Sequence, residues 1–153
     1  MIDAEPRDDQ ADRRVHLETA LGNFDVDPCD VMRFPDGLPG FERSRQFVLL
    51  TSAGLAPLQC LHSIDERPAS FLAIDPRLVL PRYRCILSDG DRTRLGVKDS
   101  SALLWLALVT MIDDNEATVN LRAPIVINPA RMVGYQVLPY NSLYPLRYPL
   151  ALE

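Results

Sequence analysis

Prolines divide this sequence into short segments, and that feature constrains the fold more than any other. The chain has 13 prolines among 153 residues, well above the average share of about 5%. They are spread along the sequence rather than gathered in one tract. Because proline lacks a backbone N–H, long helices and long central strands do not pass through such positions. We therefore expect many short elements, and no stretch has the sustained 3.6-residue period of a long amphipathic helix.

Short β-like runs lie between these interruptions, with turn-forming Ser, Asp, Gly and Pro residues separating them. Runs that recur about 10–12 residues apart are typical of a β-sandwich or a β-barrel. Apolar and polar side chains also alternate over residues 15–21, which indicates a half-buried strand there. We expect strands over residues 15–21, 46–51, 57–62, 70–74, 82–87, 103–112, 117–122, 124–127 and 131–138.

The remaining segments are predicted from their composition. Residues 1–14 are polar and charge-dense, so we interpret them as a flexible extension before a domain of residues 15–153. A helical turn is expected within 93–101, and the proline-rich tail 139–153 is expected to lie extended across the domain. The longest apolar stretch, 102–112, has 11 residues, fewer than the ~20 that span a membrane as a helix. We interpret it as a strand that is buried on both faces.

Charge and cysteine content restrict the possible partners and the location. The net charge is -5, whereas nucleic-acid binders and proteins that dock on anionic lipid usually carry clustered positive charge. An acidic chain suits a basic protein partner, although acidity also simply favours solubility. Three cysteines without a C-x-x-C motif are neither a disulfide framework nor a zinc motif. Since no secretory signal pattern opens the sequence, we expect a cytoplasmic location.

The sequence does not indicate a catalytic, cofactor or metal site. The two histidines are His16 and His62, and Cys60-x-His62 lacks the second pair that a zinc site requires. No nucleophile motif or phosphate-binding glycine loop occurs. We therefore expect no enzyme activity, no cofactor and no metal. The alternative is a small β-barrel enzyme or ligand-binding domain whose pocket contains His62 and nearby carboxylates.

Four sequence motifs, in a fixed order along the chain, are distinctive enough to indicate a protein family. Residues 33–42 read RFPDGLPGFE, 71–76 read FLAIDP, 118–128 read TVNLRAPIVIN, and 144–150 read YPLRYPL after a Gln-Val pair at 136–137. These strings resemble the signatures of the FliW flagellar assembly factor family and occur in the family's order. Together they cover about residues 15–150. Tyr148 stands where relatives commonly have a histidine, and residues 1–14 lie outside the pattern.

The resemblance implies a fold, partners and a function. It implies an all-β, small antiparallel β-barrel-like single domain, in agreement with the strand pattern. It also implies a non-enzymatic factor that binds flagellin and the RNA-binding repressor CsrA in mutually exclusive complexes. Flagellin bound to FliW would release CsrA to repress flagellin translation, and scarce flagellin would leave FliW free to hold CsrA. Such a switch needs only competing affinities, without direct nucleic-acid or membrane binding.

Candidate partner-binding residues follow from charge alone. We expect acids in turns to contact a basic partner, and reversing those in the turn at 113–116 to lysine to weaken its binding. Gly37, Pro39 and Gly40 are expected to shape a loop, and Asn120 to satisfy backbone groups near Pro124. A third possibility is nucleic-acid binding through four arginines close in sequence: Arg82, Arg84, Arg92 and Arg94. The predicted partner-binding acids are Asp36, Glu42, Asp65, Glu66, Asp113, Asp114 and Glu116.

Overall fold

A computed structural model describes residues 15–19, 22–65, 68–99, 102–139 and 142–152. The predicted extension, residues 1–14, lies outside the described residues. The chain's contacts group into two compact units, Met1–Val31 and Met32–Glu153. None of the helices in the described part of the chain is long and apolar enough to cross a membrane.

The smaller unit contains a hairpin and one short helix. Strands β1 (Val15–Thr19) and β2 (Gly22–Val26) pair antiparallel, with Leu17 opposite Phe24. The 3-10 helix η1 (Pro28–Asp30) follows, and the Asp27 side chain caps it by accepting from the backbone N–H of Cys29. The sequence predicted the first of these strands but missed β2, because Asp and Pro residues close behind it favoured a loop.

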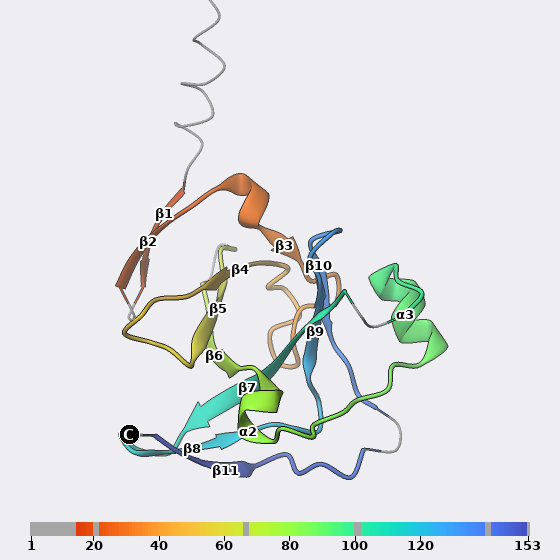
Figure 1. Ribbon diagram of the computed structural model, residues 1–153. Helices are drawn as coiled ribbons and strands as arrows, with labels where there is room; N and C mark the ends of the chain where they lie inside the picture. Colours follow the sequence, from red (N-terminus) through yellow and green to blue (C-terminus); the bar gives the residue numbers. More distant parts are fainter. Residues whose placement is uncertain (1–14, 20–21, 66–67, 100–101, 140–141, 153) are drawn as a thin grey trace, which may run out of the picture. The chain divides into compact units, whose positions relative to one another are not determined.

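The larger unit is a closed barrel (Figure 1). Among the described residues, its sheet runs β11-β8-β7-β6-β5-β4-β3-β10-β9, and an additional β7–β9 pairing closes a ring of seven strands. All pairings are antiparallel except the one between β10 and β3. The predicted all-β, barrel-like fold is therefore confirmed. Its strands are β3 (Met32–Arg33), β4 (Gln46–Leu50), β5 (Gln59–Ser63), β6 (Ser70–Ile74), β7 (Leu104–Met111), β8 (Glu116–Val119), β9 (Ile125–Asn128), β10 (Val133–Gln136) and β11 (Tyr148–Ala151).

Aromatic and aliphatic side chains fill the barrel's interior. Phe34 and Phe47 are fully buried, with ring centroids 4.9 Å apart in an edge-on arrangement. Phe34 begins the Pro- and Gly-rich loop, residues 34–41, and anchors one end of that loop in the core. At the other end Phe41 is 44% exposed but packs edge-on against Phe71, with ring centroids 4.9 Å apart. The loop is thus held at both ends, once inside the core and once at its surface.

Of two predictions about the middle of the chain, one is wrong and the other is partly right. Residues 82–87 form no strand; this stretch is irregular and is held by buried Tyr83 and Leu87. The helix α3 (Asp89–Leu95) begins earlier than the predicted turn at 93–101, because Ser88 and Asp91 form a reciprocal capping box. A second short helix, α2 (Pro76–Val79), follows β6, with Asp75 as its N-cap.

The long apolar run and the tail differ in detail from expectation. β7 is not buried on both faces throughout, because Leu104 and Met111 at its ends are 46% and 40% exposed. The tail contributes β11, which pairs with β8 outside the closed ring. The predicted extended tail is therefore partly a strand at the edge of the sheet.

Candidate partner-binding site

The turn between β7 and β8 brings three of the predicted acids together. We call residues 111–116 the acidic turn. The backbone carbonyl of Glu116 accepts from the N–H groups of Ile112 and Asp113 at 2.8 and 3.2 Å. Oδ1 of Asp113 accepts from the N–H groups of Asn115 and Glu116, both at 2.8 Å. The Asp113 carboxylate therefore stabilises the turn itself.

Asp114 and Glu116 do not take part in the hydrogen bonds of this turn through their side chains. Both are exposed, and neither carboxylate makes a hydrogen bond or ion pair within the described part of the chain. Met111 and Ile112, which precede them, are 40% and 61% exposed. Sequence reasoning missed these two apolar residues because it assigned them to a buried strand. An apolar contact beside unpaired charge is the composition of a typical protein-binding patch.

Asp36 lies in the Pro- and Gly-rich loop but is already paired. Its carboxylate forms an ion pair with Arg94 of α3 at 3.2 Å, and both side chains are partly exposed. The Arg94 guanidinium also lies 4.8 Å from the centroid of the Tyr135 ring. The charge of Asp36 is thus compensated within the protein, which weakens its candidacy as a partner contact.

Glu42 stabilises the same loop from its other end. Its Oε2 accepts from the backbone N–H of Gly40 at 2.8 Å, and this hydrogen bond lowers the pKa of Glu42. Gly37 has a positive φ of 62°, and a Cβ there would lie 2.5 Å from the backbone oxygen of Phe41. The loop-shaping role predicted for Gly37 is therefore confirmed.

Asp65 joins neighbouring strands rather than facing a partner. Its Oδ2 accepts from the backbone N–H groups of Arg45 and Gln46 at 2.8 and 3.0 Å, and from Ser63 Oγ at 3.1 Å. Its predicted neighbour Glu66 lies outside the described residues. Among the predicted acids that the structure describes, then, only those of the acidic turn include carboxylates without a hydrogen bond or ion pair to another described residue.

Comparison with known proteins gives this barrel a family. The FliW protein family model matches residues 16–150. A flagellar assembly factor FliW from Thermotoga neapolitana is 33% identical over 137 residues, which cover 88% of this chain and 92% of that protein. A flagellar assembly factor FliW from Geobacter sulfurreducens is 33% identical over 132 residues, which cover 86% of this chain and 82% of that protein. The chain belongs to the FliW family.

A solved structure supports the same assignment. The crystal structure of a flagellar assembly factor FliW superimposes with a TM-score of 0.77 at 28% identity, covering 88% of this chain and 94% of that one. The barrel described above is thus the FliW fold, and the family resemblance found in the motifs is confirmed.

The family motif at 118–128 has a structural explanation in this FliW chain. Oδ1 of Asn120 accepts from the backbone N–H groups of Arg122 and Ala123 at 3.1 and 3.0 Å. These bonds shape the bend between β8 and β9, as predicted for Asn120. Within this motif, Asn120 therefore stabilises the bend between two strands of the barrel.

Among the described residues, the alternative site around His62 shows a hydrogen bond to a serine and none to a carboxylate. His62 is 6% exposed, and its Nδ1 lies 2.6 Å from Ser70 Oγ. Cys60, on the same strand, is fully buried, and burial raises the pKa of its thiol. Within the described residues, no three His, Cys, Asp or Glu side chains are grouped so that they could hold a metal ion.

The four arginines proposed for nucleic-acid binding are not equivalent in the FliW structure. Arg92 pairs with Asp89, and Arg94 pairs with Asp36 and Asp91. Arg82 and Arg84 lie on the irregular segment before α3 and are exposed. Ion pairing therefore compensates the two arginines of α3, and the set does not form one uncompensated basic stripe.

Proposed function

We propose that this protein is a cytoplasmic flagellar assembly factor that binds flagellin and a CsrA-type repressor in mutually exclusive complexes. Family membership supports the proposal, since relatives that are 33% identical over most of their length are named flagellar assembly factors. The protein acts by binding alone and catalyses no reaction. It contacts neither nucleic acid nor a membrane directly.

The proposed switch works by competition. Unassembled flagellin that accumulates occupies the protein, which releases the repressor to bind flagellin messages. When flagellin is exported into filaments, the freed protein holds the repressor again and translation resumes. Each partner shifts the equilibrium only by its own affinity and concentration, so no covalent step is needed.

The acidic turn is the observation that carries the repressor half of the proposal. An RNA-binding repressor is basic because it must neutralise phosphates. Asp114 and Glu116 offer carboxylates without internal partners, and Ile112 offers an exposed apolar contact at the same turn. Complementary charge steers the encounter, and the apolar residue adds area that is desolvated on binding.

The free edge of β11 supports the flagellin half. Among the strands that the structure describes, β11 is the terminal strand of its sheet and pairs on one side with β8. Flagellin's terminal segments are amphipathic before assembly, and an extended segment can add to an exposed strand edge. Pro149 within β11 lacks a backbone N–H, which limits how many hydrogen bonds that edge offers.

A charge reversal at the turn tests the repressor half. The double variant Asp114→Lys/Glu116→Lys leaves Asp113 unchanged, because that carboxylate holds the turn. We expect its affinity for a purified CsrA-type repressor to fall at least about tenfold in low-salt calorimetry, the effect of losing roughly 1.4 kcal/mol.

The matched control changes the net charge equally on the β1–β2 hairpin. Glu18→Lys/Asp25→Lys replaces two carboxylates whose side chains are 80% and 62% exposed. It should bind the repressor like the parent protein. Equal affinity for both double variants would exclude the acidic turn as the contact, and failure to bind either flagellin or the repressor would reject the function.

A further inference from the structure

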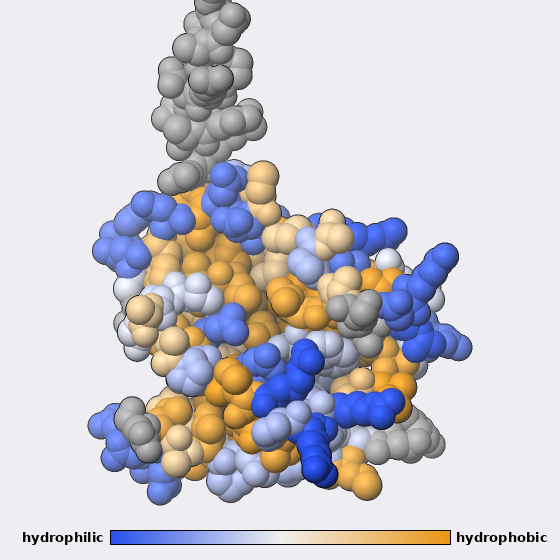
Figure 2. All heavy atoms as spheres, in the orientation of Figure 1, coloured by the Kyte–Doolittle hydropathy of each residue, from blue (hydrophilic) through white to orange (hydrophobic). Residues whose placement is uncertain are grey.

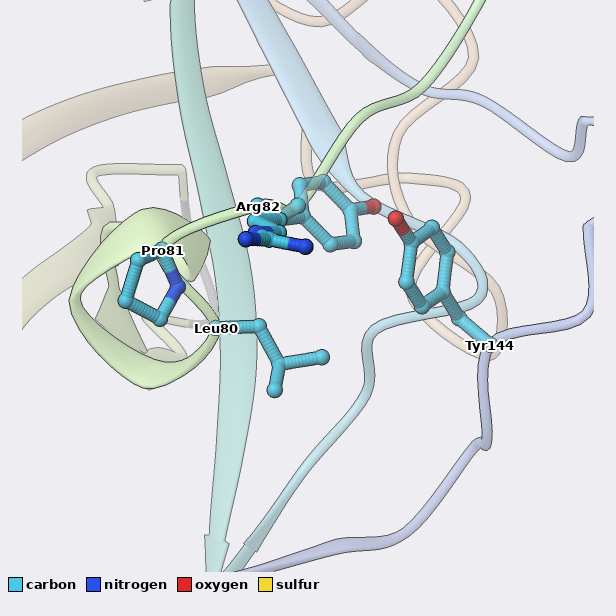
Figure 3. Close-up of a pocket in the computed structure, with 5 residues that line it drawn as sticks. Leu80, Pro81, Arg82 and Tyr144 are labelled. Atoms are coloured by element: carbon cyan, nitrogen blue, oxygen red, sulfur yellow. The ribbon is translucent and has the colours of Figure 1, made fainter.

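A hollow with tyrosine walls lies near the far end of β8 from the acidic turn. Its volume is about 330 Å³, and Leu80, Pro81, Arg82, Tyr83 and Tyr144 line it. We call it the tyrosine hollow. Figure 3 shows the side chains of Leu80 and Tyr144 directed toward the same space, with Arg82 beside it. This volume is at the low end of the range typical of ligand pockets. It therefore suits one bulky side chain better than a cofactor.

The walls of the tyrosine hollow are fixed by internal bonds. The rings of Tyr83 and Tyr144 lie 4.5 Å apart between centroids. The Tyr83 hydroxyl donates to the backbone oxygen of Leu121 at 2.8 Å, and the Tyr144 hydroxyl accepts from the backbone N–H of Arg84 at 2.9 Å. Since the hollow is lined mainly by the rings and aliphatic parts of these side chains, it offers mostly apolar surface. A rigid apolar wall loses little conformational entropy on binding.

Positive charge surrounds this apolar space. Arg82 lines the hollow, and Nε of Arg122 donates to the backbone oxygen of Tyr144 at 2.8 Å. Both arginines are exposed, and within the described residues neither lies in an ion pair. Figure 2 shows strongly hydrophilic atoms directly beside hydrophobic ones over α2 and the segment before β11. The chain as a whole has a net charge of -5, so the positive charge around the hollow is opposite in sign to that of the whole protein.

We propose that the tyrosine hollow is a docking site for an acidic peptide segment of a protein partner. A large aliphatic or aromatic side chain of the peptide enters the hollow, and carboxylates beside it pair with Arg82 and Arg122. Guanidinium groups suit carboxylates because they can donate two parallel hydrogen bonds. The apolar contact and the charge contacts together fix the peptide's position.

A peptide fits these observations better than an RNA strand. RNA binding requires positive charge spread along a groove, to follow successive phosphates. Here the nearby arginines of α3 are compensated by Asp89, Asp91 and Asp36. Near the hollow, the arginines without an ion pair to a described residue include Arg82 and Arg122, which border one small apolar space. Such an arrangement matches one side chain and its neighbours.

The tyrosine hollow is separate from the acidic turn and does not depend on the proposed function. The acidic turn ends at Glu116, the first residue of β8. Leu121 and Arg122, which bond to the tyrosines of the hollow, come after Val119, the last residue of β8. Five residues of extended chain separate Glu116 from Leu121, or roughly 16 Å at strand spacing. A basic partner at the turn and an acidic peptide at the hollow therefore use different contacts.

The test is a titration of the full chain with a synthetic seven-residue peptide that has a central phenylalanine between three glutamates on each side. We expect NMR amide shifts to concentrate at residues 80, 82–84, 122 and 144. Replacing Arg82 with serine should weaken binding about tenfold, as expected for one lost charge-assisted contact. Arg43→Ser is the matched control, because Arg43 is exposed, outside the hollow and in no ion pair with a described residue.

Further probes separate the contributions and decide the outcome. A peptide with alanine in place of phenylalanine, and one with lysines in place of the glutamates, should each bind at least about tenfold more weakly. Equal binding of all three peptides, or an unchanged affinity of Arg82→Ser, would overturn the proposal. So would binding of a ten-nucleotide uridine RNA at these residues in preference to the acidic peptide. Repressor and flagellin titrations of Arg82→Ser report on the proposed function independently.

Discussion

At the scale of single residues, one glycine controls the packing of the core. A Cβ at Gly134 in β10 would lie 2.5 Å from the ring of Phe34, which is fully buried. The ring has little room to move, because Phe47 packs against it. We expect Gly134→Ala to lower the free energy of unfolding by about 1–3 kcal/mol, as is typical of overpacking.

Urea denaturation followed by circular dichroism measures this change. Gly54→Ala is the matched control, because a Cβ at Gly54 meets nothing within 4 Å and its φ is not positive. The control should leave stability within about 0.5 kcal/mol of the parent. Equal stability of the two alanine variants would contradict the close approach of Phe34 to β10.

His62 makes stability depend on pH in the mildly acidic range. Burial lowers the pKa of His62 below its ordinary value of 6.5, so the folded protein favours the neutral ring. Below pH 6.5 the unfolded chain binds a proton that the folded chain resists, and folding is disfavoured. The contribution of neutral His62 to stability is therefore fully present above pH 6.5, and it is lost as pH falls from 6.5 toward the lowered pKa of His62.

We expect thermal unfolding at pH 5.5 to occur at a lower temperature than at pH 7.5. His62→Gln should reduce this difference, because glutamine does not titrate in this range. The chain's other histidine, His16, has a side chain that is 56% exposed, and His16→Gln should preserve most of the difference. The opposite ranking of the two variants would place the pH dependence in the hairpin instead.

At the scale of elements, the β7–β8 turn depends on one side chain. Oδ1 of Asp113 accepts from two backbone N–H groups at 2.8 Å, and asparagine carries the same acceptor without the charge. We expect Asp113→Ala to lower the free energy of unfolding by about 1–2 kcal/mol, and Asp113→Asn to stay within about 0.5 kcal/mol of the parent. Chemical denaturation of both variants checks this, and similar losses in both would mean that charge, rather than hydrogen bonding, holds the turn.

Strands with strong β-forming residues and clear turns on both sides were predictable. The prediction for 70–74 coincides with β6, and that for 46–51 differs from β4 by one residue. β2 was missed, because its GNFDV sequence has few strand formers and gains its place by pairing with β1. Residues 82–87 look like a strand in sequence, but the side chains of Tyr83 and Leu87 hold an irregular path. Tertiary contacts determine the secondary structure of these two segments, and such contacts cannot be predicted from the local sequence.

The helix α3 carried a signal that could have been used. Ser88 and Asp91 have the S-x-x-D spacing of a capping box, and Gly96 ends the helix with φ of 75°. For the candidate site, by contrast, the sequence alone could not show which of the predicted acids have carboxylates that are free of internal hydrogen bonds. Acidic residues are visible in a sequence, but only geometry separates carboxylates that hold backbone groups, as in Glu42 and Asp65, from those without such use, as in Asp114.

At the scale of the whole barrel, surfaces of opposite charge coexist on a closed sheet. The β7–β9 pairing completes the ring, and β8 extends from β7 outside it. The acidic turn lies at the start of β8, and the tyrosine hollow lies beyond its end. Both surfaces therefore lie mainly beside the closed ring rather than on its own strands. Partners at the two surfaces exclude each other only where their contacts overlap.

The proposed exclusivity of the two partners makes a quantitative prediction for the molecule as a whole. If flagellin and the repressor cannot bind together, the repressor's apparent Kd rises in proportion to free flagellin, reaching about elevenfold at ten times flagellin's own Kd. If both can bind and merely weaken each other, the apparent Kd reaches a plateau, and each partner weakens the other by the same factor. Calorimetric titrations of the repressor at increasing flagellin concentrations distinguish the cases. We expect a linear rise without a plateau, because the switch loses its sharpness once a ternary complex holds both partners. A plateau, or a complex of all three proteins in size-exclusion chromatography, would replace competition with coupling between separate sites.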